Sequence, residues 1–209
     1  YAAASGDFGE VLFGTTLSLF QRNAIVQDMT LFGVGATGNN VGNGGTTLGR
    51  IGFGYVYPDF NASFRYTTPS YNGTTLSAGL YNPSQIRSTT DGANTAFTAN
   101  GADFPRVEAE LNINLSQISE GSNLAISGMY QEAENAGELE AEGIHVGGTI
   151  VGGPAALTAH YYNGECLGIT LQMDLSATSA DGVCRDADGY YVQGTYSYGA
   201  GKVGVSWGG

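Results

Sequence analysis

The segment RVEAELNINL, residues 106–115, alternates polar and apolar side chains at every position. Successive side chains of a β-strand point to opposite faces, so this segment predicts a strand with one apolar wall and one polar wall. The apolar wall consists of Val107, Ala109, Leu111, Ile113 and Leu115, and the polar wall of Arg106, Glu108, Glu110, Asn112 and Asn114. The fold therefore depends on whether the rest of the chain repeats this pattern.

Composition excludes several classes of protein. The chain has 209 residues, of which 34 are glycine, and its 19 acidic and 7 basic side chains give a net charge of −12. We expect no nucleic-acid partner, because such proteins carry a basic surface. Abundant tyrosine and phenylalanine argue against an acidic disordered chain. No apolar run reaches the roughly 20 residues of a membrane helix, but a membrane strand needs only about 9–11 alternating residues.

The alternation recurs along the chain, and its connections differ in length. We predict strands at residues 7–16, 61–67, 75–81, 106–115, 124–131, 144–151, 156–162, 190–198 and 202–207. Residues 48–58 fit either a short strand or the returning arm of a loop. Short turns alternate with long connections at 17–47, 83–104, 132–142 and 163–188, as if one end of a sheet carried turns and the other carried loops.

Aromatic side chains gather near the ends of the predicted strands, for example at Tyr66, Tyr81, Tyr130, Tyr161 and Trp207. Aromatic girdles, alternating strands, and turns and loops at opposite ends are typical of a transmembrane β-barrel. In lipid only a closed barrel pairs every strand edge. We therefore predict an all-β, antiparallel transmembrane β-barrel, residues 1–209 forming one partial barrel domain, in preference to a soluble sandwich.

Two cysteines, Cys166 and Cys184, flank a polar stretch. Neither lies in a CxxC or His–Cys spacing that would suggest zinc or redox chemistry. We predict a disulfide that closes an extracellular loop at residues 164–188, in an oxidising compartment; two free thiols are the alternative. The chain starts at Tyr1 and stops at Gly209 within its pattern, so we expect it to be an excerpt of a longer mature protein.

Four stretches resemble the trimeric outer-membrane porins of Gram-negative bacteria. They are FGEVLFGTTLSLFQR, ASFRYTTPSYNGTTLSAGLYNP, GGPAALTAHYYNGE and DGYYVQGTYSYGAGKVGVSWG. The resemblance implies a sixteen-stranded barrel, of which this chain would cover roughly the fifth to thirteenth strands. It also implies that residues 17–47 form an inward-folded constriction loop, and that the protein forms a homotrimer in the bacterial cell outer membrane, in contact with lipid and lipopolysaccharide.

Alternation also predicts which side chains face the lumen if the apolar face meets lipid: Arg65, Arg106, Glu108, Glu110, His145, His160 and Gln193. Porins of the family set acidic groups on the loop against basic groups on the wall. Candidates here are Asp28 on the loop and Arg50, Arg65 and Arg106 on or near the wall, with Arg22 as a further candidate. Each of these charges has an alternative interpretation as a solvated charge far from the narrowest point.

No catalytic motif such as GxSxG, HExxH or a P-loop occurs in the chain. Glu108 and Glu110 as an acid–base pair, or His145 and His160 as metal ligands, are weaker explanations than lumen lining. We therefore expect no enzyme, no cofactor and no metal site. The predicted function is a water-filled channel for passive diffusion of ions and small hydrophilic solutes. A substrate-specific porin and a surface adhesin or receptor barrel are the alternatives.

Overall fold

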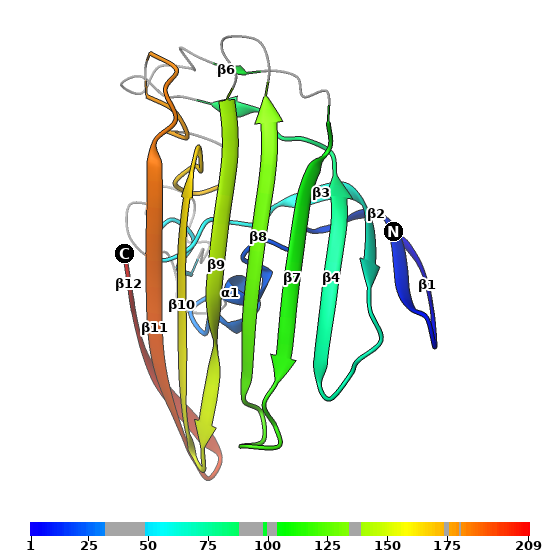
Figure 1. The fold of residues 1–209 in the computed structure, drawn as a ribbon. Helices are drawn as coiled ribbons and strands as arrows, with labels where there is room; N and C mark the ends of the chain where they lie inside the picture. The colour runs from blue at the N-terminus through cyan, green and yellow to red at the C-terminus, as the bar shows by residue number, and fades with distance from the viewer. Residues whose placement is uncertain (32–48, 88–97, 100–103, 134–138, 174–175, 180) are drawn as a thin grey trace.

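Ten antiparallel strands form one sheet in a computed structural model, which describes residues 1–31, 49–87, 98–99, 104–133, 139–173, 176–179 and 181–209 (Figure 1). The spatial order is β1-β2-β3-β4-β7-β8-β9-β10-β11-β12. The strands are β1 (Ala2–Gly6), β2 (Gly9–Leu17), β3 (Phe60–Thr67), β4 (Thr74–Tyr81), β7 (Arg106–Asn114), β8 (Asn123–Ala133), β9 (Leu139–Gly152), β10 (Ala155–Glu165), β11 (Asp186–Tyr198) and β12 (Gly201–Gly208). Each strand pairs with the next one of this series along the chain, so the sheet is a continuous meander.

Three short elements complete the described structure. Helix α1 (Arg22–Gln27) lies between β2 and β3, and the two-residue strands β5 (Ile86–Arg87) and β6 (Thr98–Ala99) pair with each other between β4 and β7. In the part of the chain that the structure describes, no helix is long and apolar enough to cross a membrane.

Turns and long connections alternate along the sheet, as the sequence predicts. One end, called the turn end, carries the tight connections, such as the β3–β4 hairpin. That hairpin turns at Asn72 and Gly73, which have φ values of 50° and 81°. Two successive positive φ values are typical of the type I′ turn, and they explain the Asn-Gly pair at this position. The opposite end, called the loop end, carries the long connections after β2, β4, β8 and β10 (Figure 1).

Several strands differ in extent from those predicted from the sequence; β10 and β11, for example, continue into the predicted connection 163–188. Strand β1 was not among the predicted strands, yet it pairs with β2 from Ala2↔Phe13 to Gly6↔Gly9. Strands β8 and β9 continue to the pair Ala133↔Leu139, so Glu132 lies in β8 and both Glu140 and Glu142 lie in β9. These glutamates alternate with inward alanines, and the ladder therefore continues through the stretch predicted as an acidic loop. Glu134 and Glu138 lie outside the described residues.

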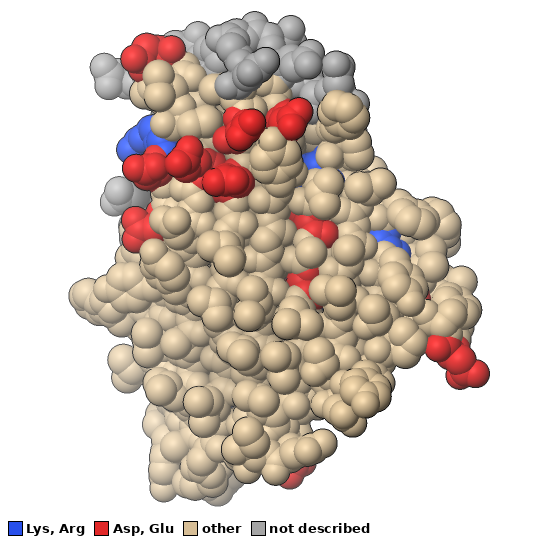
Figure 2. Space-filling view, in the orientation of Figure 1, with Lys and Arg blue, Asp and Glu red and all other residues tan. Residues whose placement is uncertain are grey.

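The outer face of the sheet is apolar. Large hydrophobic side chains on it remain exposed, including Val107, Val146, Ile150, Leu157 and Trp207. Figure 2 shows a largely uncharged surface over the strands, with most acidic groups gathered toward the loop end. An exposed apolar band of this size is expected where strands meet lipid.

The inner face carries the polar members of the same strands. Arg106, Glu108, Glu110, His145 and Gln193 are all buried there. The side chains alternate between the two faces along each strand, which follows from the strand period of two. The connection between β2 and β3 helps to bury these polar groups, because its helix α1 lies against the inner side of the sheet (Figure 1).

Candidate pore-lining site

The connection between β2 and β3 is described at residues 18–31, called the inward segment, and at residues 49–59, called the returning arm. The inward segment is held on the wall by Glu108 of β7. One carboxylate oxygen of Glu108 accepts the backbone N–H groups of Leu19 and Phe20 over 2.6 and 2.8 Å. The other accepts the Nε of Arg106 over 2.8 Å. The buried carboxylate is paired with a cation and hydrogen-bonded on both oxygens. These contacts offset the free-energy cost of removing its charge from water.

Helix α1 makes a second polar contact with β7, at Glu110, two residues after Glu108 and on the same face. The Arg22 guanidinium forms an ion pair with Glu110. Asn23 donates from Nδ2 to Glu110 over 2.7 Å and to Asn112 over 2.9 Å. Arg22 keeps about a quarter of its side chain exposed, whereas Glu110 has none. The loop thus supplies the cation and the wall the carboxylate, which is the opposite of the family arrangement used for the sequence prediction.

Asp28, the acidic candidate on the loop, joins the two arms of the connection instead of facing the basic wall. Its carboxylate accepts the backbone N–H of Thr30 over 2.8 Å, the backbone N–H of Arg50 over 2.7 Å and the hydroxyl of Tyr55 over 2.9 Å. Burial, and next the negative charge of Asp28, raise the pKa of Tyr55 well above its usual value. The hydroxyl therefore stays protonated and keeps donating at ordinary pH.

The predicted arginines of the wall occupy separate positions. Arg50 points from the returning arm to β12, where its Nε donates to the Ser206 hydroxyl over 3.0 Å. Arg65 of β3 lies 3.8 Å from Glu10 of β2 and is nearly buried. Arg106 is completely buried; it donates to the hydroxyls of Ser84 and Ser18 over 2.7 and 3.1 Å. Its guanidinium also lies over the ring of Tyr81, 5.5 Å from the centroid.

Several contact residues were absent from the sequence-predicted set. Gln21 donates its backbone N–H to the Ser127 hydroxyl over 3.1 Å and accepts the Val56 N–H over 3.0 Å, which links both arms to β8. Tyr191 of β11 donates its hydroxyl to the carbonyl of Ala24 over 2.7 Å. The signal for Ser127 and Tyr191 was present, since both lie on inward positions of their strands. Gln21 had no such signal, because periodicity does not describe loops.

Gln193 and the two histidines lie on the inner face, at the places that alternation predicts. Gln193 accepts the Met29 N–H over 3.0 Å and donates to the Gln27 carbonyl over 2.6 Å. His145 Nε2 lies 2.8 Å from His160 Nδ1, and the two rings stack. Among the described residues, no group of three or more His, Cys, Asp or Glu side chains is placed to hold a metal ion.

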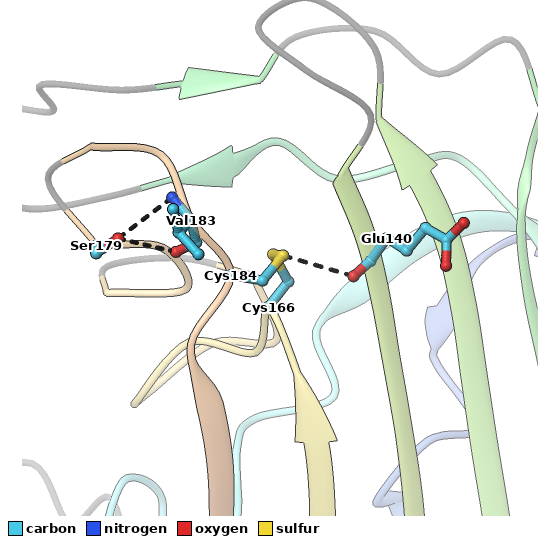
Figure 3. Close-up of a disulfide and its surroundings, with 5 residues drawn as sticks. All are labelled: Glu140, Cys166, Ser179, Val183 and Cys184. Carbon is cyan, nitrogen blue, oxygen red and sulfur yellow. Dashed lines mark hydrogen bonds between the residues drawn. A yellow bond between two sulfur atoms is a disulfide. The ribbon is translucent and has the colours of Figure 1, made fainter.

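The predicted disulfide is confirmed. Cys166, directly after β10, is bonded to Cys184, two residues before β11 (Figure 3). The Cys184 sulfur lies 3.6 Å from the carbonyl oxygen of Glu140 in β9. Ser179 and Val183 exchange hydrogen bonds within the loop, with the Ser179 hydroxyl accepting the Val183 N–H over 3.2 Å. The bond therefore joins the residue after β10 to the residues just before β11, at the loop end of the sheet.

These features describe a curved sheet that is apolar outside and polar inside, with a loop bound across its inner face. The sequence profile of the Gram-negative porins matches residues 1–209. The chain belongs to the Gram-negative porin family. This porin is therefore an outer-membrane protein, and its sheet is part of a transmembrane antiparallel β-barrel. The predictions of family, fold class and location are confirmed.

A known outer membrane channel shares the fold. The outer membrane channel DcaP of Acinetobacter baumannii superimposes with a TM-score of 0.63 at 16% identity, over 95% of this porin and 52% of DcaP. This porin chain thus spans about half the length of DcaP. A loop L8 deletion mutant of OmpT, an outer membrane protein of Vibrio cholerae, gives a TM-score of 0.42 at 13% identity over 99% of this chain and 71% of that one. No curated protein sequence matches the chain.

Proposed function

We propose that this porin forms a water-filled channel for passive diffusion of ions and small hydrophilic solutes, and that the inward segment limits the size of what passes. The channel performs no catalytic step. Support comes from one observation above all: the inward segment is bound across the inner face, from Glu108 of β7 to Tyr191 of β11. A segment fixed at so many points on a barrel wall narrows the lumen beside it.

Charge in the narrowed region follows from the same contacts. Arg22 retains partial exposure beside the buried Glu110, so the loop presents a cation toward the lumen. The acidic groups Glu132, Glu140 and Glu142 lie exposed on the outer side of β8 and β9. They therefore act on ions only at a distance, through the field at the mouth. Taking these charges together, we expect the channel to prefer cations weakly, because the overall charge is −12.

The experiment is a conductance measurement on the full-length mature protein in a planar lipid bilayer. Ohmic single-channel steps, with a reversal potential under a salt gradient, are the expected result. If the membrane contains protein shown to be folded and inserted but no conductance steps are recorded, the channel proposal is contradicted. Retention of large but not small neutral polymers inside loaded liposomes then gives the size limit.

A substrate-specific porin is the second candidate, and one observation favours it. A largely apolar cavity of about 740 Å³ lies beside α1, lined in part by Ile25, Val26, Tyr57, Phe60 and Leu171. An apolar surface next to a polar lumen can retain a solute that has an apolar body. A specific channel predicts that a micromolar solute of this kind interrupts the ion current, whereas a general channel shows no block.

Assembly and surroundings complete the proposal. The porin functions as a homotrimer, with lipid against its apolar outer face and lipopolysaccharide near its acidic loop end. Native mass spectrometry of the detergent-extracted protein tests the trimer directly. A monomer that conducts contradicts trimerisation while leaving the channel itself intact. An adhesin or receptor barrel, in contrast, predicts partner binding by a protein that does not conduct.

A further inference from the structure

The segment that follows β10 also folds toward the inner side of the sheet. Residues 166–173, called the cysteine segment, contain Leu167, Gln172 and Met173, each only 2% exposed. A loop that merely covered the outside of a barrel would expose such side chains to water. Their burial requires neighbours from other elements, and the contacts of the segment identify them.

The first neighbour is the returning arm. The Tyr57 N–H donates to the Thr170 carbonyl over 2.7 Å, and Tyr57 pairs with Leu171 in an isolated parallel bridge. Gln172 Nε2 lies 3.4 Å from Glu108, the carboxylate that also holds the inward segment. The cysteine segment therefore touches both the returning arm and the anchor of the inward segment.

The second neighbour is an apolar cluster shared by both loops. Phe20 and Val56 of the first connection pack with Leu167 and Met173 of the cysteine segment. The wall contributes inward side chains of β8, β9 and β10 to the same cluster, namely Met129, Ala133, Ala141 and Tyr162. Inward positions of a porin wall that faces water are polar. Here the inner face becomes apolar near the loop end, at the positions where the two loops pack.

The disulfide fixes this arrangement at its base. Cys166 is completely buried, and its N–H donates to the Arg185 carbonyl over 3.1 Å. Thr178 and Cys184 form an isolated antiparallel bridge next to the disulfide. The bond thus limits how far the cysteine segment can move away from β10 and β11. Between this segment and the returning arm lies a mainly polar cavity of about 410 Å³, lined by Asp59, Asn61, Asn82 and Gln172 among others.

We propose that the cysteine segment is a second pore-narrowing element, which holds the returning arm in place and, through its disulfide, sets the conductance of the channel. This inference rests on the proposed diffusion channel. It assigns the Cys166–Cys184 bond a positioning role inside the pore, in addition to any contribution to stability. The residues that transmit the effect are Leu167, Gln172 and Met173, because they contact the first loop and its anchor.

The test reduces the bond in a channel that is already inserted, so folding is not in question. A dithiol reductant gives up two electrons and two protons; the S–S bond of the porin becomes two thiols, and the reductant becomes a cyclic disulfide. Added to both compartments of the bilayer, it is expected to raise the single-channel conductance by a factor of roughly 1.5, because conductance follows pore width. Reoxidation is expected to restore the original step.

Variants separate positioning from stability. The double variant Cys166→Ser/Cys184→Ser is expected to show the larger conductance before any treatment. The reductant is expected to leave that conductance unchanged. Leu167→Ala/Met173→Ala is expected to raise the conductance with the disulfide intact, whereas Ile169→Ala, an exposed position of the same segment, leaves it unchanged. In the variants that widen the pore, the conductance is expected to rise. The melting temperature of the barrel in detergent is expected to stay close to that of the wild type.

The outcomes are distinguishable. Wild-type channels that conduct, but whose steps are unchanged by reduction and by Leu167→Ala/Met173→Ala, overturn the second narrowing element and leave the diffusion channel standing. A shift in melting temperature without any change of conductance overturns it as well, because the bond then acts on stability alone. Folded wild-type protein that never conducts overturns both proposals.

Discussion

The backbone N–H of Leu19 donates to the carboxylate of Glu108 over 2.6 Å and so joins the inward segment to strand β7. These two residues are 89 positions apart in sequence. Strand alternation places Glu108 on the inner face of the sheet, and this contact makes Glu108 an anchor for the inward segment. The charge that would otherwise face water is matched instead by backbone donors and by Arg106.

Glu108→Gln is expected to loosen the inward segment. The amide keeps one acceptor oxygen, but it leaves the guanidinium of Arg106 buried without a counter-ion, and breaking a buried pair costs about 3–5 kcal/mol. Single-channel recordings should show larger and noisier steps than the wild type. Glu132→Gln, the same change at an exposed outward position of β8, is the control and should behave as wild type. Identical recordings for the two variants contradict the anchoring role.

Arg22→Glu is expected to shift the channel toward cations. The new carboxylate lies next to Glu110, so the positive side chain on α1, which the proposed channel places toward the lumen, is replaced by a second negative one. The measurement is the reversal potential under a tenfold salt gradient. Lys202→Glu makes the same charge change at an exposed position near the β11–β12 turn and should shift the potential much less. Equal shifts for both variants indicate that Arg22 lies outside the ion path.

Tyr55→Phe is expected to be less stable than the wild type at neutral pH. This difference in stability is expected to shrink at alkaline pH. The hydroxyl hydrogen bond to Asp28 contributes on the order of 1 kcal/mol. The pKa of Tyr55 is higher in the folded state than the ordinary value of 10.0. Its contribution is therefore complete below pH 10 and declines as the pH rises further, because the unfolded chain then loses its proton first.

Melting temperatures in detergent at pH 8 and pH 11 measure this effect. The gap between wild type and Tyr55→Phe should be larger at the lower pH. Tyr71→Phe, at an exposed turn residue, provides the matched control with no gap at either pH. A gap that is constant with pH contradicts the role assigned to the phenol proton.

Gly143→Ala is expected to displace the inward segment. A Cβ at Gly143 would lie 2.6 Å from the ring of Phe20, and the ring is confined by the apolar cluster around it. Overpacking of this kind costs typically about 1–3 kcal/mol. We expect lower thermal stability together with an altered conductance. Gly194→Ala, where a Cβ meets nothing within 4 Å, should change neither quantity. Wild-type values for Gly143→Ala contradict the packing of Phe20 on β9.

Val146→Arg tests the lipid-facing side of the wall. Val146 lies on the outer face of β9 with 42% of its surface exposed. An arginine near the bilayer midplane destabilises a membrane barrel by about 2–4 kcal/mol, less near the interfaces. Urea titration of refolding into lipid vesicles measures the loss. Val146→Leu keeps the apolar character and should refold as wild type. An unchanged midpoint for the arginine variant contradicts contact with lipid at this position.

The sequence alone determined which face each strand residue occupies. Strand side chains have a period of two, so placing Val107 on the outer wall fixed Glu108 and Glu110 on the inner one. The same local rule placed His145, His160 and Gln193 on the inner face. The continuation of β8 and β9 through Glu132, Glu140 and Glu142 was missed, because a run of acidic residues resembles a loop in composition.

Only the tertiary structure decided which inner groups meet. Arg22 pairs with Glu110, Asp28 joins Arg50 and Tyr55, and Gln172 reaches Glu108. Pairing within a sheet is set by neighbouring strands and repeats along the chain. A loop that folds across the sheet has no period, and its partners lie far away in sequence, so side-chain shape and hydrogen bonding in three dimensions select them.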